Sequence, residues 1–164
     1  MGPGRKKSWY RGVVALLAII HVLAAVIGVG PTYFFPALLR SSLPPSELRG
    51  VLELSRRLAR YPQIGGPVAV VSGIALVFAI DPHLFSQKWI IGSIVLFVAI
   101  QVVVMAFAVP ATKKLAAWAF HPANANANVL PPEAESHYRR LRAAHTVAAV
   151  LGTVLFGLMI AKPV

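Results

Sequence analysis

Residues 16–31 read LLAIIHVLAAVIGVGP, and this stretch decides the fold class. His21 stands inside an apolar run that continues to about residue 39. A helix needs about 20 consecutive apolar residues to cross a bilayer, so the run is long enough to span. An imidazole is costly in hydrocarbon unless a partner compensates for it. The stretch therefore predicts a membrane-spanning helix whose histidine is turned towards other helices.

The composition of the whole chain also indicates a membrane protein. Of the 164 residues, 57% are hydrophobic and only 13% are charged, whereas a soluble domain usually has about 25% charged residues. The chain has no cysteine, which excludes disulfides, thiolate nucleophiles and cysteine-bound metal clusters. The length suits one compact bundle, so we expect a single domain over residues 1–164.

Four apolar segments predict an all-α polytopic membrane protein, an antiparallel four-helix transmembrane bundle with helical extensions on the cytoplasmic side. The first segment is too long for a cleavable secretory signal. We also expect an amphipathic helix at about 46–60 and a flexible loop at 121–132, which is rich in Asn and Ala and bounded by prolines. The four spans are expected at about 10–39, 61–80, 88–109 and 143–161.

The basic residues predict both the partner surface and the orientation. Sixteen Lys and Arg oppose five acids, for a net charge of +11. They flank the apolar spans, so we expect contact with anionic lipid headgroups and not with nucleic acid. Ten of the sixteen lie in loops 40–60 and 110–142, which favours these loops in the cytoplasm and both termini outside the cell membrane. The basic cluster in residues 1–11 alone favours the opposite orientation.

Polar and small residues inside the spans are the candidate functional positions. His21 is near the middle of the first span, and His145 is near the start of the last. The simplest interpretation is that His21 bonds to Gln101, Ser72 or a backbone carbonyl and so specifies helix packing. Small residues on the two histidine-bearing faces would let helix backbones approach closely. Those expected at packing contacts are Ala25, Gly28, Ala148 and Gly152.

An alternative interpretation is that His21 and His145 are the axial ligands of a haem b. A haem needs two imidazoles at similar depth. From a rise of about 1.5 Å per residue we expect the two histidines to differ in depth by about 6–10 Å, which makes packing the preferred interpretation. No compact metal-binding motif is present, so no metal site is expected.

Two stretches carry a resemblance to known proteins. The segments LAIIHVLAAVIGVGPTYFFPALL and QKWIIGSIVLFVAIQVVVMAFAVPATKKL resemble an uncharacterised family of predicted four-helix bacterial integral membrane proteins, known as a domain of unknown function. The chain also distantly resembles copper-resistance-D type proteins and the small membrane protoporphyrinogen oxidase. The oxidase resemblance implies a haem-linked histidine on the first helix and a lysine on the third, roles that His21 and Lys88 would take.

Three functions follow from these observations, and none of them fixes a reaction. The first is an accessory or structural bundle protein, acting as a homo-oligomer or within a larger membrane complex. The second is a haem- or redox-cofactor-binding protein, a haem chaperone or small oxidoreductase, that uses His21 with His145 or Lys88. The third is a small-solute carrier that acts as an oligomer, which the lack of an intramembrane acid disfavours.

Overall fold

The structure is a computed structural model that describes residues 3–40 and 43–163, with side chains from residue 8 onwards. The side chains of Arg5, Lys6 and Lys7, which belong to the N-terminal basic cluster, lie outside the described part. The described residues form helices and loops and contain no strand. The predicted all-α fold class is therefore confirmed.

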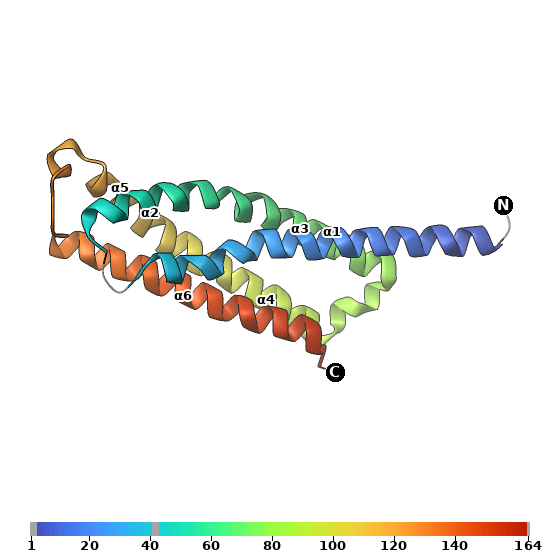
Figure 1. Cartoon of the computed structure of the whole chain (residues 1–164). Coiled ribbons are helices and arrows are strands. Elements are labelled where there is room, and N and C mark those ends of the chain that lie inside the picture. The colour runs from blue at the N-terminus through green and yellow to red at the C-terminus, as the bar shows by residue number, and fades with distance from the viewer. Residues whose placement is uncertain (1–2, 41–42, 164) are drawn as a thin grey trace.

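Six α-helices and three short helical turns follow one another along the described part of the chain (Figure 1). The α1 helix runs unbroken through Pro31 and Pro36. The elements are α1 (Pro3–Leu38), α2 (Pro45–Leu58), α3 (Arg60–Ile80), η1 (Pro82–Ser86), α4 (Lys88–Val103), the π-helical turn η2 (Val104–Ala108), α5 (Val109–Ala119), η3 (Pro122–Asn124) and α6 (Pro132–Ala161).

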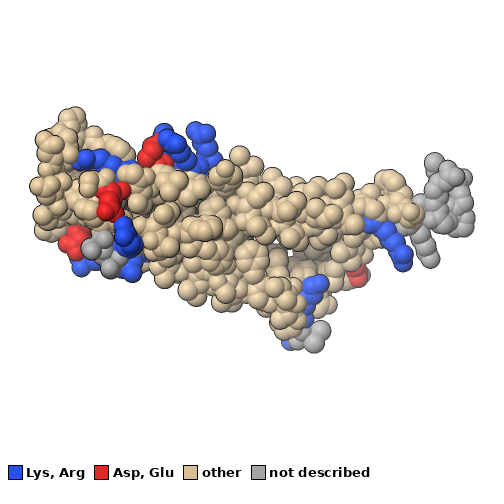
Figure 2. Space-filling view, viewed as in Figure 1, with Lys and Arg blue, Asp and Glu red and all other residues tan. Residues whose placement is uncertain are grey.

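Within residues 3–40 and 43–163, four helical segments are long and apolar enough to cross a membrane. They are Ser8–Leu38, Pro45–Ile80, Lys88–Ala119 and Pro132–Ala161. Lys and Arg gather towards the two ends of the visible face, and an uncharged band separates them (Figure 2). The chain is therefore built to sit with this band in hydrocarbon and its charged ends in the headgroup regions.

Glycine residues bring α1 and α3 into close contact. A Cβ atom added to Gly65 would lie 2.6 Å from the Gly28 nitrogen and 2.8 Å from the Ala24 oxygen. The contacts run in opposite order along the two helices. The Tyr10 hydroxyl, near the start of α1, donates to the Ala79 oxygen near the end of α3. Backbone-to-backbone packing at small residues stabilises helix pairs in lipid, where no hydrophobic driving force acts between helices.

The third span continues into α5 through a π-helical turn, Val104–Ala108, just before Pro110. Proline lacks an N–H group and its ring crowds the carbonyl four residues earlier, here that of Ala106. A π-type turn relieves this conflict without breaking the helix. The segment Lys88–Ala119 thereby remains one continuous helical rod.

The largest buried core lies at the end of the bundle where α2, α5 and the start of α6 meet. Leu48 and Leu115 are completely buried there. Arg49 ties α2 to the end of α5, because its guanidinium donates to the Ala119 oxygen at 2.8 Å and to the Asn124 oxygen at 2.6 Å. This end is thus packed like a water-soluble bundle and extends the transmembrane helices.

Candidate functional site

His21 joins α1 to α3 through its ring nitrogen. Its Nδ1 atom lies 2.8 Å from the Ala69 oxygen and 3.5 Å from the Ser72 hydroxyl. A carbonyl can only accept, so Nδ1 carries the proton and donates to Ala69. Ser72 is buried and donates at 2.6 Å to the Val68 oxygen of its own helix. The imidazole is therefore a hydrogen-bonded link between two membrane helices.

The space around the ring is closed on the α3 side by Gly73. A Cβ atom added there would lie 2.8 Å from Cε1 and 3.0 Å from Nδ1 of His21. Ser72 and Gly73 thus form the surface of α3 on which the imidazole packs. The lack of a side chain at Gly73 is what lets the ring lie against this helix.

His145 occupies a different place, on the contact between α6 and α1. Its ring stacks on Phe35, with centroids 4.2 Å apart and planes inclined by 23°. Its Nδ1 atom is buried and has no hydrogen-bond partner among the described residues. The ring therefore packs as an aromatic surface, and its polar edge is left unpaired.

The two histidines are not brought together. His145 lies beside Phe35, which is fourteen residues from His21 along the continuous helix α1. At 1.5 Å per residue this separation is about 21 Å along the axis. The expected depth difference of about 6–10 Å was therefore too small, because the last span meets the first near the end of α1 and not at its middle. One haem cannot bridge imidazoles so far apart in depth.

Lys88 begins α4 at the edge of the apolar band and is exposed. The Lys162 ammonium lies over the ring of the neighbouring Trp89, with its nitrogen 5.5 Å from the ring centroid. Both features are those of a helix end at a membrane interface. Among the described contacts of His21, all polar partners come from α3, so nothing here links His21 to Lys88.

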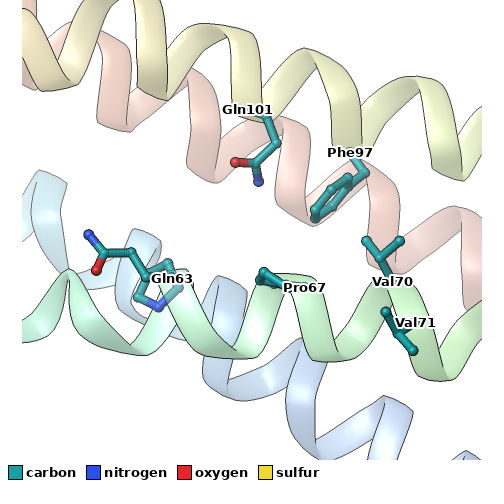
Figure 3. A pocket seen from close by; sticks show the side chains of 8 residues that line it. Gln63, Pro67, Val70, Val71, Phe97 and Gln101 are labelled. Atoms are coloured by element: carbon teal, nitrogen blue, oxygen red, sulfur yellow. The ribbon is translucent and has the colours of Figure 1, made fainter.

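Gln101 faces a cleft between α3 and α4 that sequence reasoning did not anticipate. The cleft has a volume of about 470 Å³, and its walls are mostly apolar. Gln101 extends from α4 towards α3, and Gln63 on α3 lines the same cleft with its amide directed away from Gln101 (Figure 3). Both side chains are exposed. The lining residues are Pro62, Gln63, Gly66, Pro67, Val70, Val71, Phe97 and Gln101.

The expected small-residue contacts lie at two separate helix crossings. Gly28 meets α3, and the buried neighbour at that crossing is Ala24, whereas Ala25 is only half-buried. Gly152 lies against α1, where an added Cβ atom would be 3.1 Å from a methyl carbon of Val29. Ala148 is completely buried, in a cluster with Ile100 and Leu155. These faces are therefore already filled by the chain's own helices.

The remaining histidines form no metal site in the described part of the chain. There, no group of three or more His, Cys, Asp or Glu residues is close enough to hold a metal ion. His121 accepts a hydrogen bond from the Ala123 N–H in its own loop. His137 lies 3.9 Å from Glu133, one turn earlier on α6. Each of these two contacts joins residues of one loop or of one helix.

Four helical segments of spanning length, packed together at small residues, define an integral membrane protein. The chain matches, over residues 15–163, the family described as "Predicted integral membrane protein (DUF2269)". The chain belongs to this family, which confirms the resemblance to an uncharacterised family of integral membrane proteins. No curated protein and no solved structure matches it. The more distant resemblances to copper-resistance-D type proteins and the oxidase stay predictions.

Proposed function

We propose that the protein is an accessory subunit of a larger membrane assembly, and that the α3–α4 cleft receives a transmembrane helix of its partner. The observation that carries this proposal is the pair of amides, Gln63 and Gln101, in an otherwise apolar cleft. Gln101 lies inside an uncharged run, thirteen residues from Lys88 and twelve from Lys113, whereas Gln63 is three residues from Arg60 and so nearer the headgroup region. An amide exposed to hydrocarbon is unfavourable unless another group hydrogen-bonds to it.

The shape of the cleft favours a partner helix over a second copy of the same surface. A two-fold contact between identical chains needs a patch that is complementary to itself. The walls of α3 and α4 form a hollow, which fits a convex object such as a helix. A polar residue on that helix, at the depth of Gln101, would satisfy the amides, as interhelical hydrogen bonds do in membrane proteins.

The histidine geometry supports an accessory role over haem binding. His21 uses Nδ1 for the Ala69 carbonyl, so only Nε2 is free to meet an iron. His145, the second axial ligand in the haem hypothesis, lies beside Phe35, about 21 Å from His21 along the axis of α1. Both residues have packing roles that need no cofactor. A Soret band in the purified protein that is lost in His21→Ala would contradict this part of the proposal.

A photo-crosslinker at Val71 tests the partner helix. Val71 lines the cleft and is 68% exposed, and Ile64, equally exposed on the same helix, lies outside it. Benzoylphenylalanine at Val71 should cross-link to one membrane protein in native membranes, whereas the same probe at Ile64 should not. Gln101→Leu should reduce the adduct severalfold. A reciprocal cross-link, from a membrane helix of the captured protein back to Val71, completes the test.

Other adducts would overturn the proposal. A cross-link to a second copy of the chain would assign the cleft to self-association. A lipid adduct as the main product, unchanged by Gln101→Leu, would show that the cleft holds bulk lipid. An equal protein adduct from the Ile64 probe would mean that the capture is not specific to the cleft.

A further inference from the structure

A second cleft lies between α1 and the junction of α2 with α3. Its volume is about 500 Å³, and its lining combines two arginines, a tyrosine and three apolar side chains. We propose that it binds an anionic phospholipid, with the phosphate at the arginines and one acyl chain along the apolar wall. The proposal is independent of the partner helix proposed above. The lining residues are Ile27, Arg57, Leu58, Arg60, Tyr61 and Ile64.

The cleft lies where the chain passes from headgroup to hydrocarbon. Arg57 and Arg60 are the last charged residues before an uncharged run that continues to Asp81. Arg57 lies in the last turn of the charged, amphipathic helix α2, and Arg60 begins the apolar helix α3. The twenty uncharged residues 61–80 are the length that crosses the hydrocarbon core. The two guanidinium groups are therefore at the depth of lipid phosphates.

The polar end of the cleft has spare hydrogen-bond donors for an anion. Arg57 uses Nε for Glu53, at 3.2 Å, and its side chain is 74% exposed. A guanidinium has five N–H donors, so most of those on Arg57 are free for another acceptor. Arg60 has no acid within ion-pair distance among the described residues. Two arginines and one already shared carboxylate give this end a net positive charge.

The apolar end of the cleft fits a hydrocarbon chain. Ile27 on α1 and Ile64 on α3 line it and are 47% and 68% exposed. Tyr61 is 54% exposed next to Arg60 and presents a hydroxyl at the interface. Tyrosine is enriched at this depth because one end of its ring is apolar and the other is wet. Two arginines at one end of the cleft and two exposed isoleucines at the other provide binding groups for both the headgroup and the acyl chain of an anionic lipid. A free anion would use only the arginines.

The α3–α4 cleft provides an internal contrast. It has a similar size, but its polar groups are neutral amides and it has no charged residue in its lining. A cationic mouth is therefore specific to the cleft at Arg57 and Arg60. Basic residues near a membrane surface favour anionic lipid by about 1 kcal/mol each, so two of them can distinguish anionic from zwitterionic headgroups.

Lipid titration of the full chain in dodecyl maltoside tests the headgroup site. Native mass spectrometry should show dioleoyl phosphatidylglycerol bound more tightly than dioleoyl phosphatidylcholine. The double variant Arg57→Gln/Arg60→Gln should bind phosphatidylglycerol about thirtyfold more weakly. The matched control Lys113→Gln/Lys114→Gln removes the same charge from exposed positions on α5 and should bind like the wild type. An equal loss in both double variants would overturn the site, because it would show a diffuse charge effect.

A second pair of variants tests the acyl wall without altering charge. Ile64→Ser should weaken phosphatidylglycerol binding severalfold, whereas Val71→Ser, on the same helix and also 68% exposed, should not. Inorganic phosphate at millimolar concentration should leave the bound lipid in place. Displacement by phosphate, or equal binding of phosphatidylcholine, would overturn the assignment to an anionic lipid. Since all six substituted positions, in the cleft and in the controls, are exposed, the variants should fold, and their melting temperatures verify this.

Discussion

His145 stacks on Phe35, 4.2 Å between ring centroids, and thereby fixes the end of α1 against α6. His21, fourteen residues earlier on the same helix, fixes α1 against α3 through the Ala69 carbonyl. The first helix is thus the shared element of two contacts, and each contact has its own imidazole. Two histidines that could be taken for one ligand pair are two separate packing devices.

Separate roles predict that the two histidines contribute independently to stability. The changes in unfolding free energy caused by His21→Ala and His145→Ala should add, within about 0.5 kcal/mol, in the double variant. The reason is the axial separation of about 21 Å, with no shared partner. Denaturant unfolding in mixed micelles measures this sum. A coupling energy above about 1 kcal/mol would mean that one group, such as a shared cofactor, joins the two sites.

Because the Nδ1 atom of His145 has no partner, we expect that replacing this residue by phenylalanine does not destabilise the protein. His145→Phe keeps an aromatic ring for stacking on Phe35 and removes a buried polar atom that has no partner. Removing an unsatisfied buried group relieves a penalty of about 1–3 kcal/mol, so this variant should be at least as stable as the wild type. His145→Ala should instead be destabilised, because the stacking is lost. A large loss of stability in His145→Phe alone would show that the imidazole nitrogens are needed.

The close approach of α1 and α3 at Gly28 and Gly65 predicts that a bulky residue destabilises the protein at this crossing but not at a glycine elsewhere on α1. Gly65→Leu should destabilise the protein by about 3 kcal/mol or more, since its Cβ atom would meet the backbone of α1, which cannot move aside cheaply. Gly30→Leu is the matched control, because nothing lies within 4 Å of its added Cβ atom. Thermal unfolding in detergent should lower the melting temperature only for Gly65→Leu. Similar melting temperatures for both variants would contradict the close crossing of α1 and α3.

The sequence was sufficient for the fold class and for the inward position of His21, but not for which helices meet. Length and hydropathy identify spans because the bilayer imposes both, and a lone imidazole in an apolar run must find a partner. The partner itself depends on the crossing of α1 and α3 at Gly28 and Gly65, two glycines far apart in the chain. Of the three partners considered for His21, the backbone carbonyl and Ser72 are found beside it, whereas Gln101 faces the α3–α4 cleft. Spacing along one helix does not reveal which neighbouring helix its residues meet.

Arg49 illustrates a second limit of sequence reasoning. Its spacing of four from Glu53 suggests an ion pair on the surface of α2, yet Glu53 accepts from Arg56 and Arg57. Arg49 instead donates to the Ala119 and Asn124 carbonyls. Helix C-termini leave carbonyls without intrahelical partners, and a guanidinium can bind two of them at once. Only the tertiary packing of α2 on α5 brings these groups together.

This contact predicts a specific weakness at the extramembrane end. Arg49→Lys should destabilise the protein by about 1–2 kcal/mol, because an ammonium cannot reproduce the two-pronged geometry. Arg56→Lys, at an exposed position paired only with Glu53, should change stability by less than about 0.5 kcal/mol. Hydrogen exchange should also become faster at the end of α5 in Arg49→Lys. Equal stability of the two variants would argue against the contact.

The orientation in the membrane can be tested directly because the chain has no cysteine. Helix α2, helix α5 and the start of α6, which carry most of the Lys and Arg of loops 40–60 and 110–142, lie at the end of the bundle opposite the start of α1 and the end of α6 (Figure 1). The excess of Lys and Arg there predicts that this end faces the cytoplasm. Asn126→Cys, in the loop between α5 and α6, should resist a membrane-impermeant maleimide in intact cells and react after permeabilisation. Lys162→Cys, near the other end, should react in both conditions. The reverse pattern would show that the N-terminal basic cluster, and not the larger group of arginines, determines the orientation.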